Sequence, residues 1–565
     1  MVQGPRPAAA AGRLVLLAVL GAGVFLAGLE LMVTAVALPA IVPDLSDWTQ
    51  LRRASWIING YLLAYVAVMP VAGRASDVLG TRRLLLAALA LFTVGSALAG
   101  RAQDLDELIA ARVVQGAGGG ALVPLATAGA SHLFDERGRP RALGLIGALT
   151  FLGMAVGPFV GAAVLDLARL EGPLTGAGLA GSPAMDWLTP AWRWVFYVNV
   201  PVGLVALAYS WAAMGTDTPR RPGRVDLPGA LLFAAGLGCG LAAVTWAGSP
   251  EVPGGTGGLL ALALASAALV ALAVVRGALV VDGFIETRHF ADRVYASAVL
   301  VSLLTGYGLA TAIVGGAVFV DRVLYGGPET QRVALGALAA AVAAGAFLSG
   351  FLVRALAFRV SALAGLAFSA LGLVRMGAWG PDVDLARIAL DLALFGFGFG
   401  VTVTPRSTAA VEALGRRAYG AASAAVTVAR MVGMTVGLAV LTQFGSNRID
   451  ALARIVGDPL LRDTILPPGL RGRPLNDGLV VEALERWAAG QAAEIMSLLF
   501  LIALAVTVAA IVPAWLLGAG RPRRATGDGA GEEADAAIAL QARPGPRSRS
   551  DRCAARGWPA RDRRS

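Results

Sequence analysis

The chain has 565 residues, of which 57% are hydrophobic and only 15% are charged, whereas a soluble globular protein has about 25% charged residues. This composition excludes a water-soluble enzyme, a disordered chain and a coiled coil, and the two cysteines, Cys239 and Cys553, exclude a disulfide framework. The formal net charge of +10 arises from arginine without any lysine. The arginines lie in short loops and in the C-terminal tail, which indicates membrane orientation and not nucleic-acid binding.

Long apolar segments follow one another along the whole chain. A membrane-spanning helix needs about 20 mainly apolar residues, and about fourteen segments meet this requirement. They lie at residues 12–38, 55–73, 83–100, 107–130, 141–166, 192–213, 227–247, 257–279, 294–320, 331–353, 360–379, 385–405, 418–443 and 492–518. The predicted fold class is therefore an all-α polytopic membrane protein.

The arginines predict how these helices are oriented. If the N-terminus is inside, Arg82 and Arg83 lie in the first inner loop, whereas Asp44 and Asp47 lie in the first outer loop. This is the positive-inside pattern, and an even number of helices places both termini in the cytoplasm. His132 and His289 fall at the edges of predicted inner loops, and both are interpreted as surface residues.

The segments outside the spans differ in character. Residues 444–491 form a long outer connection with four prolines, and the helices on either side are expected to extend into it. Residues 519–565 contain almost no large apolar residues and predict a disordered, basic cytoplasmic tail. The expected organisation is a cytoplasmic N-terminus (1–11), a first bundle (12–213), two linker helices with flanking loops (214–293), a second bundle (294–518) and the tail (519–565).

The first inner loop, 73-GRASDVLGTRRLLL, combines glycines, a carboxylate and arginines in a tight turn. A carboxylate near a helix N-terminus is favoured by the helix dipole and can pair with arginine. Gly73, Asp77, Gly80, Arg82 and Arg83 are therefore predicted to form a conformational lock at this loop.

Four further motifs occur in a fixed order: 30-ELMVTAVALPAI, 112-RVVQGAGGGA, 147-GALTFLGMAVGPFVGA and 192-WRWVFYVNVPVG. Together with the inner loop they resemble the major facilitator superfamily, and specifically its fourteen-helix drug:proton antiporter branch. The resemblance implies two six-helix bundles plus two central helices, a site between the bundles and alternating access by rocking. It also implies a monomer in the bacterial cytoplasmic membrane, and an antiporter motif on the fifth helix at Gly153, Gly157, Pro158 and Gly161.

Charged residues inside the spans are the candidates for proton coupling, because each costs about 2.5–3.5 kcal/mol on insertion scales and is functional by default. Glu30, where the resembled family usually has aspartate, is predicted to carry the proton, with Arg112 as its charge partner. The alternative is a static ion pair of the same two residues. Arg430, Asp391 and Glu494 are the other predicted intramembrane charges.

The sequence gives no support for metal binding, nucleotide binding or catalysis. No His, Cys and Asp cluster has metal-ligand spacing, and the glycines of 396-GFGFG follow no predicted strand, so they do not indicate a dinucleotide site. There is no phosphate-binding loop and no G-x-S-x-G motif. The prediction is that the protein is not an enzyme, needs no cofactor and is not driven by ATP.

The predicted function is export of hydrophobic or cationic amphiphilic drugs by proton antiport, with protons and the bilayer as the other partners. The alternative is export of lipids such as triacylglycerides. The segment 420-GAASAAVTVARMVGM and the long outer region are similar to a mycobacterial lipid-exporting branch of the same family. In that branch an acidic residue precedes the glycine–proline motif of the fifth helix, and Phe151 stands at the matching position here. Uptake, amino-acid export and a non-transporting receptor are the remaining alternatives.

Overall fold

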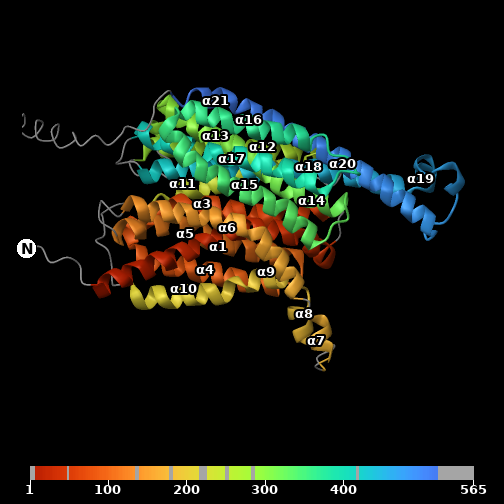
Figure 1. Ribbon diagram of the computed structural model, residues 1–565, viewed down its shortest axis with the longest axis horizontal. Helices are drawn as coiled ribbons and strands as arrows, with labels where there is room; N and C mark the ends of the chain where they lie inside the picture. The colour runs from red at the N-terminus through yellow and green to blue at the C-terminus, as the bar shows by residue number, and fades with distance from the viewer. Residues whose placement is uncertain are drawn as a thin grey trace, which may run out of the picture. The chain divides into compact units, whose positions relative to one another are not determined.

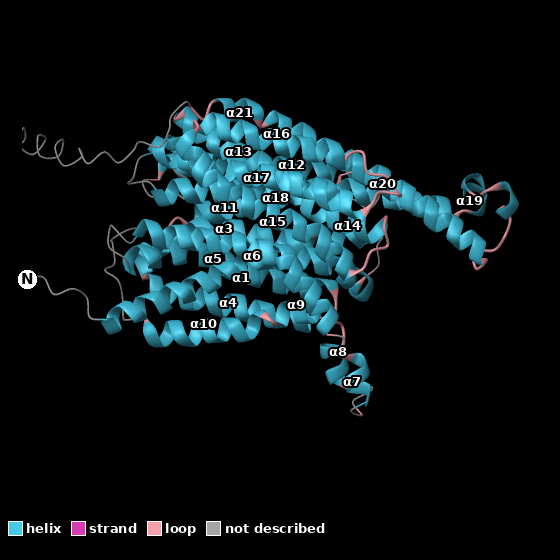
Figure 2. Ribbon diagram, viewed as in Figure 1, coloured by secondary structure: helices cyan, strands magenta, loops and turns pink. Residues whose placement is uncertain are grey.

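The computed structural model describes residues 7–46, 50–133, 139–168, 170–176, 178, 182–214, 225–247, 254–280, 287–414 and 419–518. Helices make up most of this part of the chain, and no strand occurs in it (Figure 2). The predicted tail at 519–565 lies outside the described residues, as do the side chains of Asp77, His132, Phe151 and Pro158.

The helices follow the predicted order. The first half consists of α1 (Pro7–Leu45), α3 (Trp56–Leu79), α4 (Thr81–Arg101), α5 (Leu105–Leu133), α6 (Arg139–Leu167), α9 (Arg193–Tyr197) and α10 (Asn199–Ala213). The middle pair is α11 (Leu227–Trp246) and α12 (Gly255–Leu279). The second half consists of α13 (Arg293–Ala310), the π-helical turn η3 (Thr311–Gly315), α14 (Gly316–Arg322), α15 (Pro328–Ala355), α16 (Phe358–Met376), α17 (Leu385–Leu414), α18 (Tyr419–Gly457), α20 (Gly478–Ala509) and α21 (Ile511–Trp515).

Most of these helices are suited to a bilayer. In the described residues, 12 helices are long and apolar enough to cross a membrane, and α1, which bends by 46° between its segments Val15–Glu30 and Val33–Leu45, is a thirteenth. Helix α6, with 29 residues, occupies the place of the remaining predicted span. The predicted all-α polytopic class is confirmed. Several helices extend past the predicted spans; for example, α1 ends at Leu45 instead of residue 38, and α17 continues to Leu414 instead of ending at residue 405.

The two halves pack in corresponding ways. In the first, α1 packs against α6, and α3 and α4 pack against α5; in the second, α13 packs against α18, and α15 and α16 pack against α17 (Figure 1). Contacts of α6 with α15 and of α3 with α18 join the halves. Helix α11 contacts both α3 and α18, whereas α12 packs mainly on α11. Only 6% of the apolar window of α12 is buried, so most of its surface suits contact with lipid.

Glycines set the closest helix crossings. A Cβ atom at Gly28 of α1 or Gly153 of α6 would overlap the backbone of the facing helix. The same is true of Gly306 in α13 and Gly433 in α18. Small residues allow such close approach in membranes, where packing replaces the hydrophobic effect as the force between helices. The repeated arrangement supports the interpretation of the two halves as related bundles.

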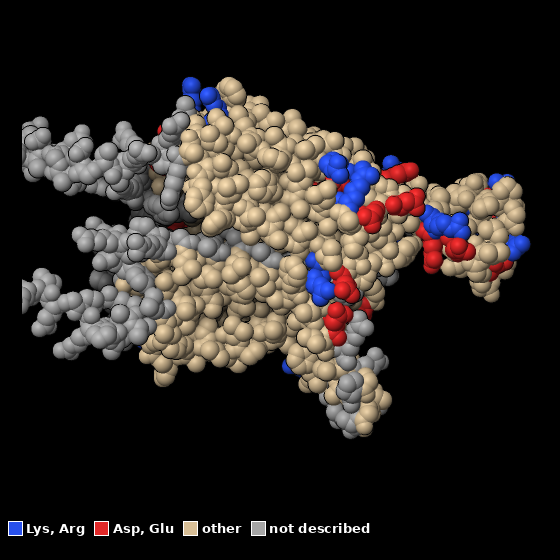
Figure 3. All heavy atoms as spheres, in the orientation of Figure 1, with Lys and Arg blue, Asp and Glu red and all other residues tan. Residues whose placement is uncertain are grey.

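The long connection at 444–491 is largely helical, as expected. Helix α18 continues to Gly457, α20 begins at Gly478, and α19 (Pro459–Ile465) lies at the tip between them (Figure 1). Asp458 and Asp477 cap the following helices by accepting hydrogen bonds from the backbone N–H groups of Leu460 and Leu479. Charged side chains gather at this end of the view, whereas the flanks of the helices are almost free of them (Figure 3).

The predicted inner-loop lock lies at the junction of α3 and α4. Gly80 joins the two helices with φ +94°, and Gly73 packs 3.6 Å from the Pro124 side chain of α5, measured from a Cβ built on the glycine. Arg82 donates to the backbone carbonyl of Trp211 on α10 at 2.6 Å, which ties this loop to the end of the first bundle. The contact expected with Asp77 lies outside the described side chains, and Arg83 is exposed.

We expect Gly80→Ala to destabilise this turn. A side chain is strained at φ +94°, and such a backbone conformation costs about 1–3 kcal/mol for a residue other than glycine. Thermal unfolding in detergent should show a lower Tm for Gly80→Ala than for Gly257→Ala, a glycine with nothing within 4 Å of its built Cβ. Equal Tm values for the two variants would show that the turn relaxes without cost.

Candidate functional site: a buried ion pair and an apolar cavity

The first half contains a fully buried ion pair. Glu30 of α1 and Arg112 of α5 are 0% and 1% exposed, and Arg112 Nη1 donates to Glu30 Oε1 at 2.5 Å. The structure thus brings together the two residues that the sequence singled out, and their role in proton coupling stays a prediction. A buried carboxylate and guanidinium tolerate desolvation only when their remaining polar atoms are also bonded.

Neutral side chains complete the bonding of Glu30. Asn199 of α10 donates to Glu30 Oε2 at 2.7 Å, and Thr34 donates to Glu30 Oε1 at 3.1 Å. Both carboxylate oxygens thus accept hydrogen bonds from within the first bundle.

The guanidinium group of Arg112 also has several bonding partners besides Glu30. Its Nη1 also donates to Gln115 Oε1 at 2.5 Å, its Nε donates to the Ile57 carbonyl at 3.1 Å, and its guanidinium lies 4.2 Å from the centre of the Tyr61 ring. Gln115 in turn donates to Ser96 at 2.8 Å. The network therefore joins α1, α3, α4, α5 and α10 around one charge pair.

The sequence prediction did not include Asn199, Thr34, Gln115 or Ser96. Asn199 was detectable, because it is a polar residue within the 192-WRWVFYVNVPVG motif and lies in a largely apolar span. Gln115 lies three residues after Arg112, on the same helical face. The hydroxyl residues carried no such signal, since Ser and Thr commonly bond to their own helix backbone.

Asp391 has local partners in the second half. It is 0% exposed and accepts hydrogen bonds from Arg375 Nε at 2.5 Å and Trp379 Nε1 at 3.0 Å. The Trp379 ring packs against Phe319 and Phe500, with centroids 4.9 and 5.2 Å apart. These contacts indicate that Asp391 fixes the turn between α16 and α17.

The other predicted charges lie in different settings. Glu494 is exposed on α20, where Gln491 donates to it at 3.5 Å, so the fold does not bring it into the interior. Arg430 is buried in α18, at 7% exposure. Arg406 was not predicted, because the proposed span ended at residue 405; it is 1% exposed in the extended α17.

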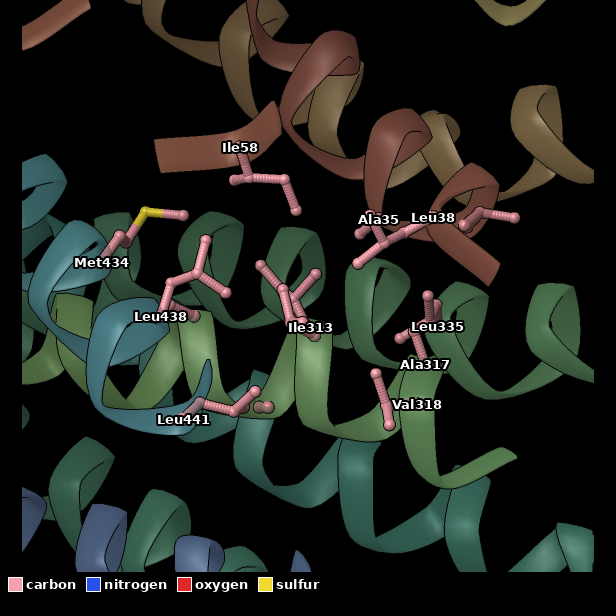
Figure 4. Packing of buried hydrophobic residues seen from close by; sticks show 14 of the residues in the cluster. Ala35, Leu38, Ile58, Ile313, Ala317, Val318, Leu335, Met434, Leu438 and Leu441 are labelled. Atoms are coloured by element: carbon pink, nitrogen blue, oxygen red, sulfur yellow. The ribbon is translucent and has the colours of Figure 1, made fainter. Parts of the chain in front are cut away.

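An apolar cavity of about 380 Å³ lies between the two halves, toward the end that bears α19. Ile58 of the first half, which lines the cavity, faces Ile313 and Leu438 of the second half (Figure 4). Among the described residues, the lining contains no carboxylate and has few polar members. The lining residues are Leu38, Ser55, Ile58, Val314, Val318, Arg322, Val323, Tyr325, Leu438, Leu441, Thr442, Gly445, Leu452, Val456, Trp487, Ala488, Ala492, Ile495 and Met496.

The predicted antiporter motif packs α6 onto α1. Gly153 contacts the backbone at Phe25, and a Cβ built on Gly161 lies 3.1 Å from Val33; Gly157 is also buried, whereas the side chain of Pro158 lies outside the described part. The motif thus lies beside the helix that carries Glu30. Any movement of α6 relative to α1 would therefore be transmitted toward the ion pair.

The described residues contain no candidate metal site. No group of three or more of their His, Cys, Asp or Glu side chains is placed to hold a metal ion. The ring of His289 packs against Tyr295, with centroids 6.0 Å apart, and His132 lies outside the described side chains.

Known proteins share this sequence pattern and fold. The model of the Major Facilitator Superfamily matches residues 20–438. The triacylglyceride transporter of Mycolicibacterium hassiacum is 33% identical over 451 residues, which cover 76% of this chain and 79% of that protein. The triacylglyceride transporter of Mycobacterium tuberculosis H37Rv is 33% identical over 431 residues, covering 71% of this chain and 77% of that protein.

Solved structures show the same fold. A bacterial homolog to the human lysosomal transporter Spinster has a TM-score of 0.62 at 18% identity, covering 92% of this chain and 100% of that one. The xylose transporter XylE from E. coli has a TM-score of 0.52 at 13% identity, covering 90% and 98% of the two chains. The predictions of two six-helix bundles and of a transporter instead of an enzyme are confirmed, and the chain belongs to the Major Facilitator Superfamily.

Proposed function

We propose that this transporter exports neutral lipids of the triacylglyceride class. The observation that carries the proposal is the chemistry of the cavity between the bundles. Side chains such as Val318, Leu441 and Met496 line it, and no carboxylate lines it in the part of the chain that the structure describes. An uncharged, strongly apolar substrate gains free energy from burial in such a cavity, in proportion to the apolar area removed from water.

The helices around the cavity also favour a lipid. Helices α18 and α20 both line it and continue past it to the tip at α19. With the orientation that the arginines predict, this end faces outward. A lipid leaving the cavity could then remain in contact with protein beyond the membrane surface.

The relatives support the same reading, because the similar mycobacterial proteins are named triacylglyceride transporters. Phe151 stands where the lipid-exporting branch has an acidic residue, so this chain would depend on other charges for coupling. We therefore assign coupling to Glu30 within the first bundle.

Proton antiport of cationic drugs, which the sequence favoured, has less support. In that mechanism one carboxylate binds either a proton or the cationic substrate. Glu30 is 0% exposed and lies inside the first bundle, bonded to Arg112, Asn199 and Thr34. It is not among the residues that line the cavity. We therefore infer that Glu30 carries the proton without contacting the substrate.

The test uses the full chain in proteoliposomes that contain a fluorescent triacylglyceride. Under a proton gradient, we expect transfer of the lipid to protein-free acceptor vesicles and no efflux of ethidium, a cationic dye. Val318→Trp should fill part of the cavity and reduce transfer by about tenfold or more, a barrier increase of about 1.4 kcal/mol.

Val374→Trp is the matched control, because Val374 of α16 is 49% exposed and faces away from the cavity. This variant should transfer lipid at the wild-type rate, and both variants should retain the wild-type Tm. Efflux of ethidium without transfer of triacylglyceride would overturn the proposal and establish drug export instead.

A further inference from the structure

Arg406 of α17 is a buried charge without a carboxylate partner in the described part of the chain. Its Nη1 donates to the hydroxyl of Thr305 on α13, and its guanidinium lies 5.0 Å from the centre of the Phe399 ring. Its Nε makes no hydrogen bond to any described residue. An intramembrane guanidinium with only neutral partners is costly, and such residues usually mark a substrate or ion site.

A second positive charge lies close to it. Arg430 of α18 is within electrostatic range of Arg406 and of the Tyr65 hydroxyl of α3. Gly306, the neighbour of Thr305, packs directly on the backbone carbonyl of Arg430. Two guanidinium groups and two hydroxyl groups thus gather where α13, α17 and α18 meet α3. Like charges in an apolar interior repel each other, and an anion between them would remove that repulsion.

A continuous apolar seam leads from the cavity to this cluster. A small gap below the cavity is lined from both halves, and Ile58, Val314 and Leu438 line both spaces. Steps of three or four residues along one face of α3 and of α18, together with a step of five residues from Ala310 to Thr305 on α13, lead from the cavity through the gap to the polar cluster. The three rows are Ile58, Leu62 and Tyr65 on α3; Val314, Ala310 and Thr305 on η3 and α13; and Leu438, Met434 and Arg430 on α18.

The length of the seam suits an amphiphile. Arg430 lies eight residues from Leu438 on α18, which corresponds to about 12 Å at 1.5 Å per residue. A molecule with one charged group at the arginines would place its apolar chain along the seam, with the end of the chain in the cavity.

We propose that Arg406 and Arg430 bind the anionic group, a carboxylate or a phosphate, of an amphiphilic lipid whose acyl chain follows the seam toward the cavity. Guanidinium groups bind both anions through charge-assisted, often bidentate hydrogen bonds. The inference rests on the proposed lipid path, and it adds charged lipids such as fatty acids or phosphatidic acid to the neutral substrates. In the conformation described here the cluster is closed by packing of α3 on α18, and rocking of the bundles would open it.

Binding of radiolabelled oleate to the purified full chain tests the proposal. We expect saturable binding of oleate and of phosphatidic acid, and at least about tenfold weaker binding of methyl oleate, a difference of about 1.4 kcal/mol. This comparison needs no variant, and equal affinities for oleate and methyl oleate would overturn the proposal. Competition by inorganic phosphate as strong as that by phosphatidic acid would show a site for small anions and would overturn the assignment to lipids.

Variants then locate the site. Arg406→Gln should weaken oleate binding by about tenfold or more, and Arg406→Lys should have an intermediate effect, because it keeps the charge but loses the bidentate geometry. Arg332→Gln is the matched control, since Arg332 is a partly exposed arginine of α15 paired with Glu329. If oleate binds Arg406→Gln and Arg406→Lys as it binds the wild type, the arginine cluster is not the site.

The experiments distinguish a failure of the anionic site from a failure of the proposed triacylglyceride export. A triacylglyceride carries no charge, so its transfer should persist in Arg406→Gln. Loss of oleate binding with normal triacylglyceride transfer would support the anionic site. Oleate binding by a wild-type protein that transfers no triacylglyceride would overturn the proposed function and leave the anion site standing.

Discussion

Glu30→Gln is expected to abolish the dependence of lipid transfer on a proton gradient. Glutamine keeps one acceptor oxygen, so it can retain the hydrogen bond from Asn199 or the one from Thr34 but not both, and it cannot bind and release a proton. Transfer driven by an imposed gradient should therefore fall by about tenfold or more, toward the rate seen without a gradient, which corresponds to at least about 1.4 kcal/mol. The measurement is the rate of triacylglyceride transfer from proteoliposomes with and without the gradient.

Two further variants test whether the effect of Glu30→Gln is due to the loss of the carboxylate at this position. Glu30→Asp keeps a carboxylate at the position where the resembled family usually has aspartate, so it should retain gradient-driven transfer. Glu329→Gln removes an exposed carboxylate of α15 and should behave as the wild type. If Glu30→Gln still responds fully to the gradient, the alternative interpretation of Glu30 as half of a static ion pair is correct.

The charge network around Glu30 and the apolar cavity lie at different positions along α1. Leu38 of α1 lines the cavity, and Glu30 lies eight residues before it on the same helix. The bend of α1 falls between these two positions. A change in the bonding of Glu30 could thus alter the packing of α1 at the cavity without any contact between proton and substrate. Separate sites also explain how an uncharged lipid could be coupled to a proton.

Much of the fold could be predicted from sequence because its determinants are local. Apolar segment length predicted the helices, since a span must bury about 20 residues in the bilayer. The resemblance added the two-bundle arrangement, which the comparisons confirm. The end of α17 was missed, because the predicted span ended at residue 405, directly before Arg406. A buried arginine inside a helix is rare enough that hydropathy alone places the boundary before it.

The candidate site was predicted only in part. Glu30 and Arg112 were identifiable, since each is a charge well inside an apolar segment. Their joint bonding with Asn199 depends on α10 packing beside α1, a contact between residues 169 positions apart in sequence, which no local pattern specifies. The apolar cavity was also inaccessible to sequence reasoning, because its lining comes from five helical regions that look like ordinary core.

Removing Arg112 alone is expected to have the largest effect on stability. Arg112→Met leaves the carboxylate of Glu30, which is 0% exposed, without its counter-ion. Breaking a buried ion pair in this way costs about 3–5 kcal/mol. The double variant Glu30→Gln with Arg112→Met removes both charges and leaves an acceptor for Asn199, so it should regain most of the lost stability. Replacing a whole buried pair is often neutral or stabilising.

Thermal unfolding of the four proteins in one detergent forms a double-mutant cycle that measures this coupling. We expect a much lower Tm for Arg112→Met than for the double variant, and no gradient-driven transfer by either. If the single and double variants are equally destabilised, the loss arises from the contacts of Arg112 with Gln115, the Ile57 carbonyl and the Tyr61 ring and not from the unpaired charge. A stable double variant without coupling would instead show that the charges of Glu30 and Arg112 are kept for transport, because the fold does not need them.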